Sequence, residues 1–428
     1  MEKTSFITPD GTRLIEVPYF LRNAYIKQNY FELPRNRFFK RILIYFYFKF
    51  LRSFWIILKI LVNSKFHFSL PKNYKIMIFD KEGCEPIYKI LKNKSCFILV
   101  TRIENLNEIF LSPKIISYVI SNFAKRSLRL NYLFSLISVI NPQKVITFND
   151  HSPDFHLAAL TFKNTKIKFI GVQQAGRSEP DFKEKYKNFY IPNYFTFGDY
   201  EKDITKNKIN NDCNYKAVGS LKASLALQFI KEKNININKK LYDICLISEP
   251  RKVQNRDFAN FNKMNQNRSL IVDHVFRFSK ENNKKIIFSG KADLNSKIDQ
   301  DTEYEVYKHF IPNTKFKISF NSKDKYGTYL DILQSELIIG SVSTMLQEAL
   351  GYKKKVLYFD FEGNSDLYPP INGISTLKDK SYNSFEKKVR EILNLDFQNY
   401  LKTINNDIDY FCYDNSQTLK LLDNELNN

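Results

Sequence analysis

The chain has 428 residues, 43% of them hydrophobic, which is enough for two domains of ordinary size with buried cores and excludes a largely disordered chain. Its 66 basic and 45 acidic residues give a formal net charge of +21, which favours anionic partners such as nucleotide sugars, phospholipid head groups, acidic glycans or nucleic acid. Because a coding bias toward Lys, Asn, Ile, Phe and Tyr would raise the charge as well, only local clusters of charge point to a binding site.

The five cysteines are scattered, with no Cys-x-x-Cys pair and no histidine at metal-ligand spacing. We therefore expect reduced core cysteines, and neither a metal nor another cofactor. The N-terminus lacks the apolar segment of a signal peptide, so we expect a cytoplasmic protein. The cysteines are Cys84, Cys96, Cys213, Cys245 and Cys412.

Residues 1–70 are predicted to form an N-terminal arm. Its segment 38–62 is the most apolar part of the chain, yet it lacks the uncharged run of about 20 residues that a spanning helix needs. On a helix its basic residues fall within about 80° of one another, opposite a broad apolar face. The segment either lies in a membrane interface, at the cytoplasmic face, or packs on the first domain with its lysines reaching solvent. The basic residues are Arg41, Lys49, Arg52 and Lys59.

Short apolar runs alternate with helical patterns through residues 71–230, the predicted first domain. Strands alternating with helices predict an α/β fold with a parallel sheet covered on both faces. A helix is expected within residues 115–140. The predicted strands are residues 75–79, 95–100, 144–148, 166–172, 194–197 and 215–218.

A lysine-rich polar segment, residues 231–240, predicts a linker, after which the alternation resumes in a second α/β domain over residues 241–375. Residues 376–428 are expected to form C-terminal helices, at 385–395 and 398–408. The predicted strands of the second domain are residues 241–247, 285–288, 315–318, 337–339 and 356–359.

Polar side chains follow the predicted strand 144–148, at the end where ligands of doubly wound sheets bind. A hydroxyl nucleophile must lose its proton as it attacks, so a carboxylate or imidazole is needed nearby. Asp150 and His151 are the leading candidates for this base, followed by Asp154. The alternative is that Ser152, Pro153 and Asp154 only form a turn and cap the next helix.

The loop after the strand 166–172 holds a second polar group, which consists of Gln173, Gln174 and Arg177. These side chains follow the neighbouring strand, and we expect them to line the cleft that binds the substrate whose hydroxyl attacks. Glutamine cannot act as a general base, so hydrogen bonding to a substrate is the expected role of both glutamines.

Residues 337–360 read as a strand, a serine-rich turn, a short helix and a second strand. Gly340 permits a tight turn, and Thr344 with Gln347 has the spacing of a capping box. Free backbone N–H groups and hydroxyls at such a helix start suit a phosphate. The alternative is an ordinary αβ unit whose serines only cap. In the same domain, Arg251 and Lys291 follow strands and could neutralise a phosphate.

This segment resembles the donor-nucleotide motif of GT-B glycosyltransferases, in which a small-residue turn precedes a helix with a glutamate. The resemblance implies that Ser341, Ser343 and Thr344 contact the donor phosphate and that Glu348 contacts ribose or sugar hydroxyls. Paired serines at this place also resemble those of transferases that use CMP-activated Kdo or sialic acid. No Asp-x-Asp motif stands in a context like that of GT-A transferases, so no metal is indicated.

The loop at residues 170–179 resembles the Gln-His-Gly turn of GT-B transferases from bacterial capsule and lipopolysaccharide loci. Gln174 stands where that family has histidine, and Ala175 precedes the glycine. The resemblance covers about residues 145–365 and implies two Rossmann-like domains with the active site in the cleft between them.

The predicted function is transfer of a sugar from a nucleotide-activated donor to a cell-surface glycan or a lipid-linked acceptor, without a metal and with peripheral contact to the inner membrane. A UDP-sugar 2-epimerase of the same fold is the alternative enzyme. A non-catalytic, membrane-associated glycan-assembly protein is the alternative of another class. No motif for nucleic-acid binding supports the charge-based alternative.

Overall fold

A computed structural model gives the fold, and it falls into two compact units. The first unit comprises the described residues of 47–225 and 410–428, and the second those of 226–409. Arg251 and nearly all of the predicted N-terminal arm lie outside the described residues. The structure describes residues 62, 64–72, 74–81, 83–91, 94–102, 107–177, 189–206, 213–250, 258–292, 296–320, 326–363, 371, 373–404 and 408–427.

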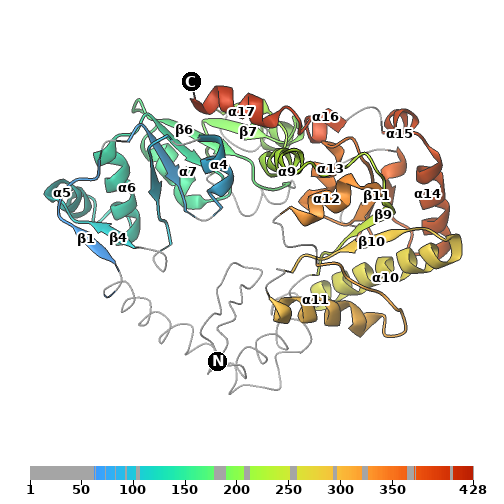
Figure 1. The fold of residues 1–428 in the computed structure, drawn as a ribbon. Helices are drawn as coiled ribbons and strands as arrows, with labels where there is room; N and C mark the ends of the chain where they lie inside the picture. The colour runs from blue at the N-terminus through green and yellow to red at the C-terminus, as the bar shows by residue number, and fades with distance from the viewer. Residues whose placement is uncertain are drawn as a thin grey trace, which may run out of the picture. The chain divides into compact units, whose positions relative to one another are not determined.

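The first unit is built on a sheet of six parallel strands in the order β3-β2-β5-β6-β7-β8 (Figure 1). Each strand lies within about two residues of its predicted position, because a strand covered on both faces is a continuous apolar run. The strands are β2 (Ile76–Phe79), β3 (Cys96–Leu99), β5 (Lys144–Thr147), β6 (Lys168–Val172), β7 (Asn193–Thr196) and β8 (Asn214–Ala217).

The helices of the first unit include the expected one within 115–140, which is divided in two. Ser127 is the N-cap of the second helix, because its Oγ accepts a hydrogen bond from the Leu130 N–H in the first turn. The helices are α4 (Glu85–Leu91), α5 (Pro113–Ser121), α6 (Leu128–Ile140), α7 (Pro153–Thr161), α8 (Tyr200–Lys206) and α9 (Leu221–Glu232), and the chain enters the second unit within α9.

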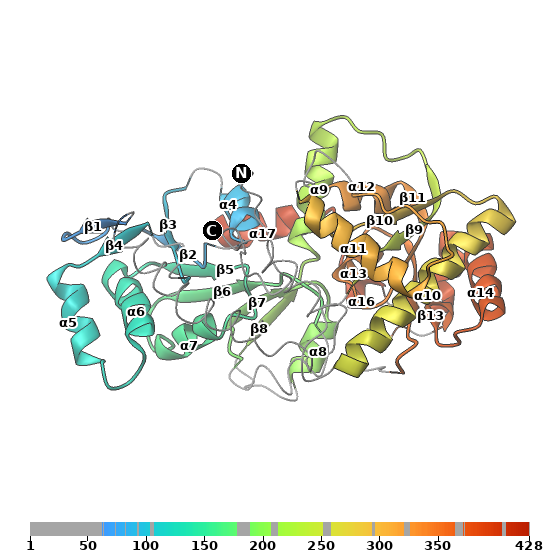
Figure 2. The ribbon, with the colours of Figure 1, turned by 90° about the horizontal axis from the view of Figure 1, so that it is seen from below.

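A separate two-stranded parallel sheet stands beside the main sheet of the first unit. It pairs β1 (Lys65–His67) with β4 (Glu108–Phe110), and the sequence analysis did not predict either strand. Figures 1 and 2 both place these strands with α5 and α6 at one end of the unit. The Tyr132 hydroxyl on α6 accepts a hydrogen bond from the Phe110 N–H at 2.9 Å, which ties the small sheet to the helix layer.

The second unit contains a five-stranded parallel sheet in the order β10-β9-β11-β12-β13. Helices α10 to α14 surround this sheet (Figures 1 and 2). The strands are β9 (Tyr242–Ile247), β10 (Ile286–Ser289), β11 (Ser335–Gly340), β12 (Lys355–Phe359) and β13 (Thr376–Leu377), and the helices are α10 (Phe258–Asn282), α11 (Lys297–Phe310), α12 (Gly327–Leu333), α13 (Thr344–Leu350) and α14 (Tyr382–Asn394).

The predicted strand at residues 315–318 was wrong. The segment runs past the edge of the sheet and makes a single bridge, between Ser319 and Ser289 of β10. Its apolar side chains serve packing: the Phe316 ring lies 4.9 Å from the Tyr304 ring and 6.3 Å from the Phe288 ring. An extended segment that is buried on one face shows the same alternation of lysine with apolar residues as a strand does, even though it lacks the strand's ladder of hydrogen bonds.

The C-terminal residues form helices, as expected, and they are divided between the two units. Helices α14 and α15 (Phe397–Thr403) belong to the second unit. The chain then returns to the first unit, where α17 (Thr418–Asn427) packs beside α4. There the Lys144 ammonium at the start of β5 donates to the Leu426 carbonyl at 3.1 Å. The short helix α16 (Ile408–Phe411) lies at the crossing point between the units in the chain.

Candidate functional site

Asp150, in the turn after β5, is the centre of a buried hydrogen-bond network. Its carboxylate accepts from the Arg177 guanidinium, from the Tyr194 hydroxyl at 2.6 Å and from the Gln174 N–H at 3.3 Å. Burial disfavours the charged form, but the Arg177 charge and these hydrogen bonds outweigh it and lower the pKa of Asp150 to about 2. The side chain is fully buried, so it is an ionised anchor that a substrate hydroxyl cannot reach in this structure.

His151 is the predicted base with access to solvent, since 45% of its side chain is exposed. Its Nδ1 lies 3.3 Å from Arg177 Nη2 and 3.8 Å from Asp150 Oδ1. In one ring tautomer Nδ1 accepts from Arg177, and in the other it donates to Asp150. A base role at Nε2 requires the second tautomer, in which the proton is on Nδ1.

Asp154 takes part in an ion pair between two helices. Both of its carboxylate oxygens accept from Arg129, at 2.7 and 3.1 Å, which ties the first turn of α7 to α6. Ser152 is the N-cap of α7, and its Oγ accepts from the Phe155 N–H at 3.4 Å. The capping alternative therefore describes the local role of Ser152.

Gln173 and Gln174 have different environments. Gln173 is buried, and its amide joins three segments: the Nε2 donates to Glu201 at 2.7 Å and to the Ala175 carbonyl, while the Oε1 accepts from the Phe197 N–H at 2.6 Å. Gln174 is only half-buried. The structure thus brings Gln174, Arg177 and His151 together around Asp150, and places the Gln173 amide in the interior.

Asp80 is a further polar residue at this sheet edge, and it was not found from the sequence. Asp80, just after β2, accepts from the Thr101 hydroxyl and from Asn149 Nδ2, both at 2.9 Å. The Oδ1 of Asn149 is buried and has no hydrogen-bond partner among the described residues. The rule that selected Asp150, a polar residue directly after a predicted strand, also applies to Asp80.

The second unit has a cavity of about 300 Å³ at the carboxyl ends of β9, β10 and β11. Two of the predicted donor-binding residues, Lys291 and Ser343, line it. Ser341, Thr344 and Glu348 do not. The lining residues are Ile247, Ser248, Glu249, Pro250, Ser289, Gly290, Lys291, Thr328, Val342, Ser343 and Met345.

The turn after β11 does not offer the free N–H groups that the sequence analysis expected. The Glu249 carboxylate accepts from the Ser341 N–H at 2.7 Å and from the Val342 N–H at 3.0 Å. Gly340 permits this approach, because a Cβ at that position would lie 2.8 Å from Glu249 Oε1 and 2.7 Å from Leu346. The Glu249 carboxylate thus takes the place that a bound phosphate would have on these two N–H groups. The N-cap of α13 is Ser343, one residue before the predicted Thr344.

The turn after β10 is closed in the same way by Glu303 of α11. Its carboxylate accepts from the N–H groups of Lys291 and Ala292, at 2.9 and 2.7 Å, and from the Ser248 hydroxyl. Burial raises the pKa of Glu303 against the opposing effect of these hydrogen bonds. The Tyr307 hydroxyl next to it bonds Ser248 Oγ at 3.0 Å, and burial raises the pKa of Tyr307 as well.

Arg268 of α10 is an unusual buried cation beside this network. It is 1% exposed, and none of its three guanidinium nitrogens has a hydrogen-bond partner among the described residues. Its charge acts on Tyr307, where it favours the ionised phenol and so opposes the raised pKa. Tyr307 in turn accepts, at 2.9 Å, from the N–H of Glu249, which lines the cavity.

Glu348, the predicted ribose ligand, is 1% exposed in this structure. Its carboxylate accepts from the buried Tyr329 hydroxyl at 3.2 and 3.3 Å, which joins α13 to α12. Burial raises the pKa of Tyr329 well above its ordinary value, and the negative charge on Glu348 raises it further.

Within the described residues no group of three metal-ligating side chains occurs, and no described helix is long and apolar enough to cross a membrane.

The sequence matches no protein-family model and no curated protein. Among solved structures, the UDP-GlcNAc 2-epimerase from Methanocaldococcus jannaschii matches at 14% identity and a TM-score of 0.51, over 82% of this chain and 99% of that chain. The UDP-GlcNAc 2-epimerase from Neisseria meningitidis, bound to UDP-GlcNAc, matches at 13% identity and a TM-score of 0.50, with the same coverage. A glycosyltransferase from Rickettsia africae ESF-5 matches at 15% identity over 83% of this chain and 97% of that chain, with a TM-score of 0.45.

At these identities the likeness concerns the fold. Two parallel α/β sheets, each covered by helices, confirm the predicted fold class, and the chain has the two-domain GT-B fold.

Proposed function

We propose that this protein is a nucleotide-sugar-dependent glycosyltransferase, with the donor bound in the cavity of the second unit. The observation that supports this most is the cavity itself, which lies at the carboxyl ends of three parallel strands, where ligands of such sheets bind. Lys291 supplies a positive charge at its rim. The charge of the buried Arg268 guanidinium acts on Tyr307, whose hydroxyl bonds the cavity residues Ser248 and Glu249, and an unpaired buried charge is expected to favour an anion nearby.

The donor phosphate is assigned to the side chains of Lys291 and Ser343. Glu249 holds the N–H groups of Ser341 and Val342, so a phosphate would have to displace this carboxylate to bind them. Lys291 stabilises the negative charge that develops on the departing nucleotide, which is the role of a positive group in metal-independent transfer. The role of Glu348 as a sugar or ribose ligand stays a prediction.

Activation of the acceptor is assigned to His151 in the first unit. The imidazole is exposed, and the ionised Asp150 beside it favours a proton on Nδ1 as Nε2 takes a proton from the acceptor hydroxyl. Asp150 and Arg177 are then positioning residues, because they hold the ring and are themselves buried. The proposed acceptor is a cell-surface glycan or its lipid-linked precursor.

Nucleotide binding tests the donor assignment. A thermal-shift panel of CMP, CDP, UDP, GDP and their sugars should show stabilisation by one nucleotide class, since a ligand bound to the native state raises its stability. A shift confined to CMP ligands would identify an acidic-sugar donor. Lys291→Ala should weaken binding about tenfold or more, on the scale of one charge-assisted contact. Lys297→Ala is the matched control, because Lys297 is an 81% exposed lysine paired with Asp301. If no member of the panel binds, the enzyme assignment fails and a non-catalytic glycan-assembly role is favoured.

A UDP-sugar 2-epimerase is the second candidate, because the structures that match at a TM-score of 0.50 or above include enzymes of that name. The two reactions differ in their products. An epimerase alters the sugar of UDP-GlcNAc in the absence of any acceptor, whereas the proposed transferase needs an acceptor to turn over. Analysis of the sugar after incubation with UDP-GlcNAc alone separates the two candidates.

A further inference from the structure

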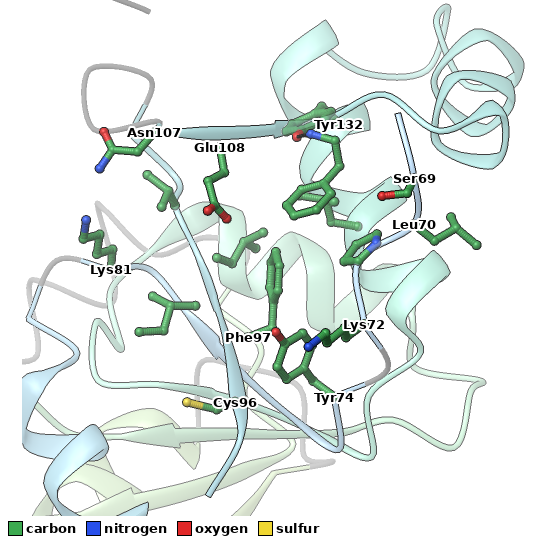
Figure 3. Close-up of a pocket in the computed structure, with 16 residues that line it drawn as sticks. Ser69, Leu70, Lys72, Tyr74, Lys81, Cys96, Phe97, Asn107, Glu108 and Tyr132 are labelled. Carbon is green, nitrogen blue, oxygen red and sulfur yellow. Dashed lines mark hydrogen bonds between the residues drawn. The ribbon is translucent and has the colours of Figure 1, made fainter. Parts of the chain in front are cut away.

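The first unit contains a second, larger cavity of about 560 Å³, within the usual size range of small-molecule sites. It runs along β3, the edge strand of the main sheet, and its other walls come from residues 69–72, β4 and α6 (Figure 3). The lining residues are Ser69, Leu70, Pro71, Lys72, Tyr74, Lys81, Cys96, Phe97, Ile98, Leu99, Val100, Asn107, Glu108, Phe110, Tyr132 and Leu136.

The wall of this cavity is apolar along its length and polar at its ends. Figure 3 shows the rings of Tyr74, Phe97 and Tyr132 facing the interior. The Tyr132 hydroxyl already accepts the Phe110 N–H, and Tyr74 brings a second phenol hydroxyl to the wall. The aromatic and aliphatic side chains between the polar ends form a stretch on which a hydrocarbon chain can pack.

The polar residues of one end, Lys81, Asn107 and Glu108, lie together on one side of the view in Figure 3. Lys81 directly follows Asp80, whose carboxylate accepts from Asn149, the residue before Asp150. This end of the cavity therefore opens toward the carboxyl edge that carries the proposed acceptor site. The ammonium of Lys81 makes no ion pair with any described residue, so it is available to an anionic group.

The surface around the other end is unusually apolar for a water-exposed region. Phe66 and Phe68 are 41% and 73% exposed, and on α5 and just after it Ile120 and Phe123 are 69% and 68% exposed. Residues 109–130 contain four basic residues and no acidic one. Exposed apolar side chains among cations are the surface that an anionic lipid layer fits. The four basic residues are Lys114, Lys125, Arg126 and Arg129, of which Arg129 is already paired with Asp154.

We propose that this cavity binds the hydrocarbon chain of an amphipathic acceptor, with its anionic phosphate head at Lys81. The ligand class is thus a long-chain lipid phosphate, with or without an attached glycan. The inference rests on the proposed function, because it is the transferase reaction that requires an acceptor. The hydrocarbon chain of the ligand lies along β3, and its phosphate head group lies at the sheet edge that carries Asp80 and Asn149.

Calorimetric titration of the full-length protein with alkyl phosphates of increasing chain length tests the site directly. Each buried methylene group should raise affinity about fourfold, so two should raise it about fifteenfold, until the chain fills the cavity. All titrations are made below the micelle concentration. Alkyl glucosides of the same chain length, which lack the anionic group, should bind more weakly. Affinity that does not depend on chain length would overturn the proposal.

Two substitutions with matched controls locate the site. Leu70→Glu places a charge in the cavity wall and should weaken dodecyl phosphate binding at least tenfold, whereas Leu128→Glu, at an exposed leucine outside the wall, should leave it unchanged. Lys81→Gln should weaken the alkyl phosphate about tenfold and the alkyl glucoside hardly at all, with Lys163→Gln, at an exposed lysine outside both the cavity and residues 109–130, as its control. Equal effects of a variant and its control would place the amphiphile elsewhere.

These titrations contain no nucleotide sugar, so they fail or succeed independently of the transferase assignment. If sugar is transferred to a short, water-soluble acceptor but the alkyl phosphates do not bind, the lipid site in the cavity is rejected and the proposed function is kept. Chain-length-dependent binding without transfer to any acceptor would keep the cavity as an amphiphile site and reject the transferase.

Discussion

At the scale of residues, the two aspartates near the end of β5 differ in burial and in their partners. Asp150 is buried with Arg177, whereas Asp154 is paired with Arg129 at a surface where both side chains are partly exposed. The same residue type therefore has two different roles four positions apart. His151, between them in sequence, presents the most exposed titratable side chain of the three, at 45% against 22% for Asp154 and 0% for Asp150.

We expect Asp150→Asn to reduce the free energy of unfolding by about 3–5 kcal/mol, because it leaves the Arg177 guanidinium, only 10% exposed, without its counter-charge. Asp154→Asn should cost about 1 kcal/mol, since this partly exposed pair is screened by solvent. Urea unfolding of both variants measures the difference. Equal losses would mean that the Asp150 pair is not the buried anchor described.

Buried His156 should make stability depend on pH. Burial lowers the pKa of His156 to about 4, below the ordinary value of about 6.5. Between these values the unfolded chain binds a proton that the native state does not, so the free energy of unfolding falls as pH falls. The loss from pH 7 to pH 5 should be about 2 kcal/mol from this group alone.

Urea titrations of the wild-type protein and of His156→Asn at the two pH values isolate this contribution. Asparagine cannot titrate, and its amide oxygen can accept from the Tyr190 N–H in place of Nδ1, which lies 3.3 Å from that group. The variant should lose about 2 kcal/mol less than the wild type between pH 7 and pH 5. The same slope in both proteins would show that His156 is not the group responsible.

At the scale of elements, the turn after β11 is held by a carboxylate from the neighbouring strand end. Glu249→Gln should reduce the free energy of unfolding by about 1–3 kcal/mol, because an amide oxygen replaces only one of the two acceptors and loses the charge. Glu232→Gln, at an exposed glutamate that accepts from Gln228, should change it by less than about 0.5 kcal/mol. A neutral result at Glu249 would mean that the turn is held by its backbone alone.

The long apolar runs of the central strands, such as residues 144–148 and 168–172, made those strands predictable from sequence. β1, β4 and β13 were missed because runs of two or three residues have no detectable period. The site was predictable only where a residue directly follows a strand. Which partner each residue meets was not, because the partners are far apart in the chain.

Glu249 and Ser341 illustrate this limit, since they are 92 positions apart, and nothing local to the serine turn indicates that a carboxylate fills it. Asp80 and Asn149 are 69 positions apart in the same way. Glu348 was selected by its place in a motif, whereas its burial against Tyr329 depends on how α12 packs on α13. Tertiary packing, which no local pattern records, therefore decides which motif residues reach solvent.

At the scale of the whole molecule, each unit offers a different part of the proposed reaction. The second unit has the cavity with Lys291, and the first has the Asp150–Arg177–His151 cluster together with the larger apolar cavity. The fold alone is compatible with a transferase and with an epimerase, so the reaction has to be decided by products.

The most direct measurement follows labelled sugar from the donor that the thermal-shift panel identifies. The acceptors are free oligosaccharides and monosaccharides linked to alkyl phosphates, each compared with a reaction that has no acceptor. We predict that label moves to an acceptor, and that His151→Ala slows this transfer by about 10²–10⁴-fold while donor binding is unchanged. Label that stays on the nucleotide as an epimerised sugar, or a His151→Ala variant with full transfer activity, would contradict the account.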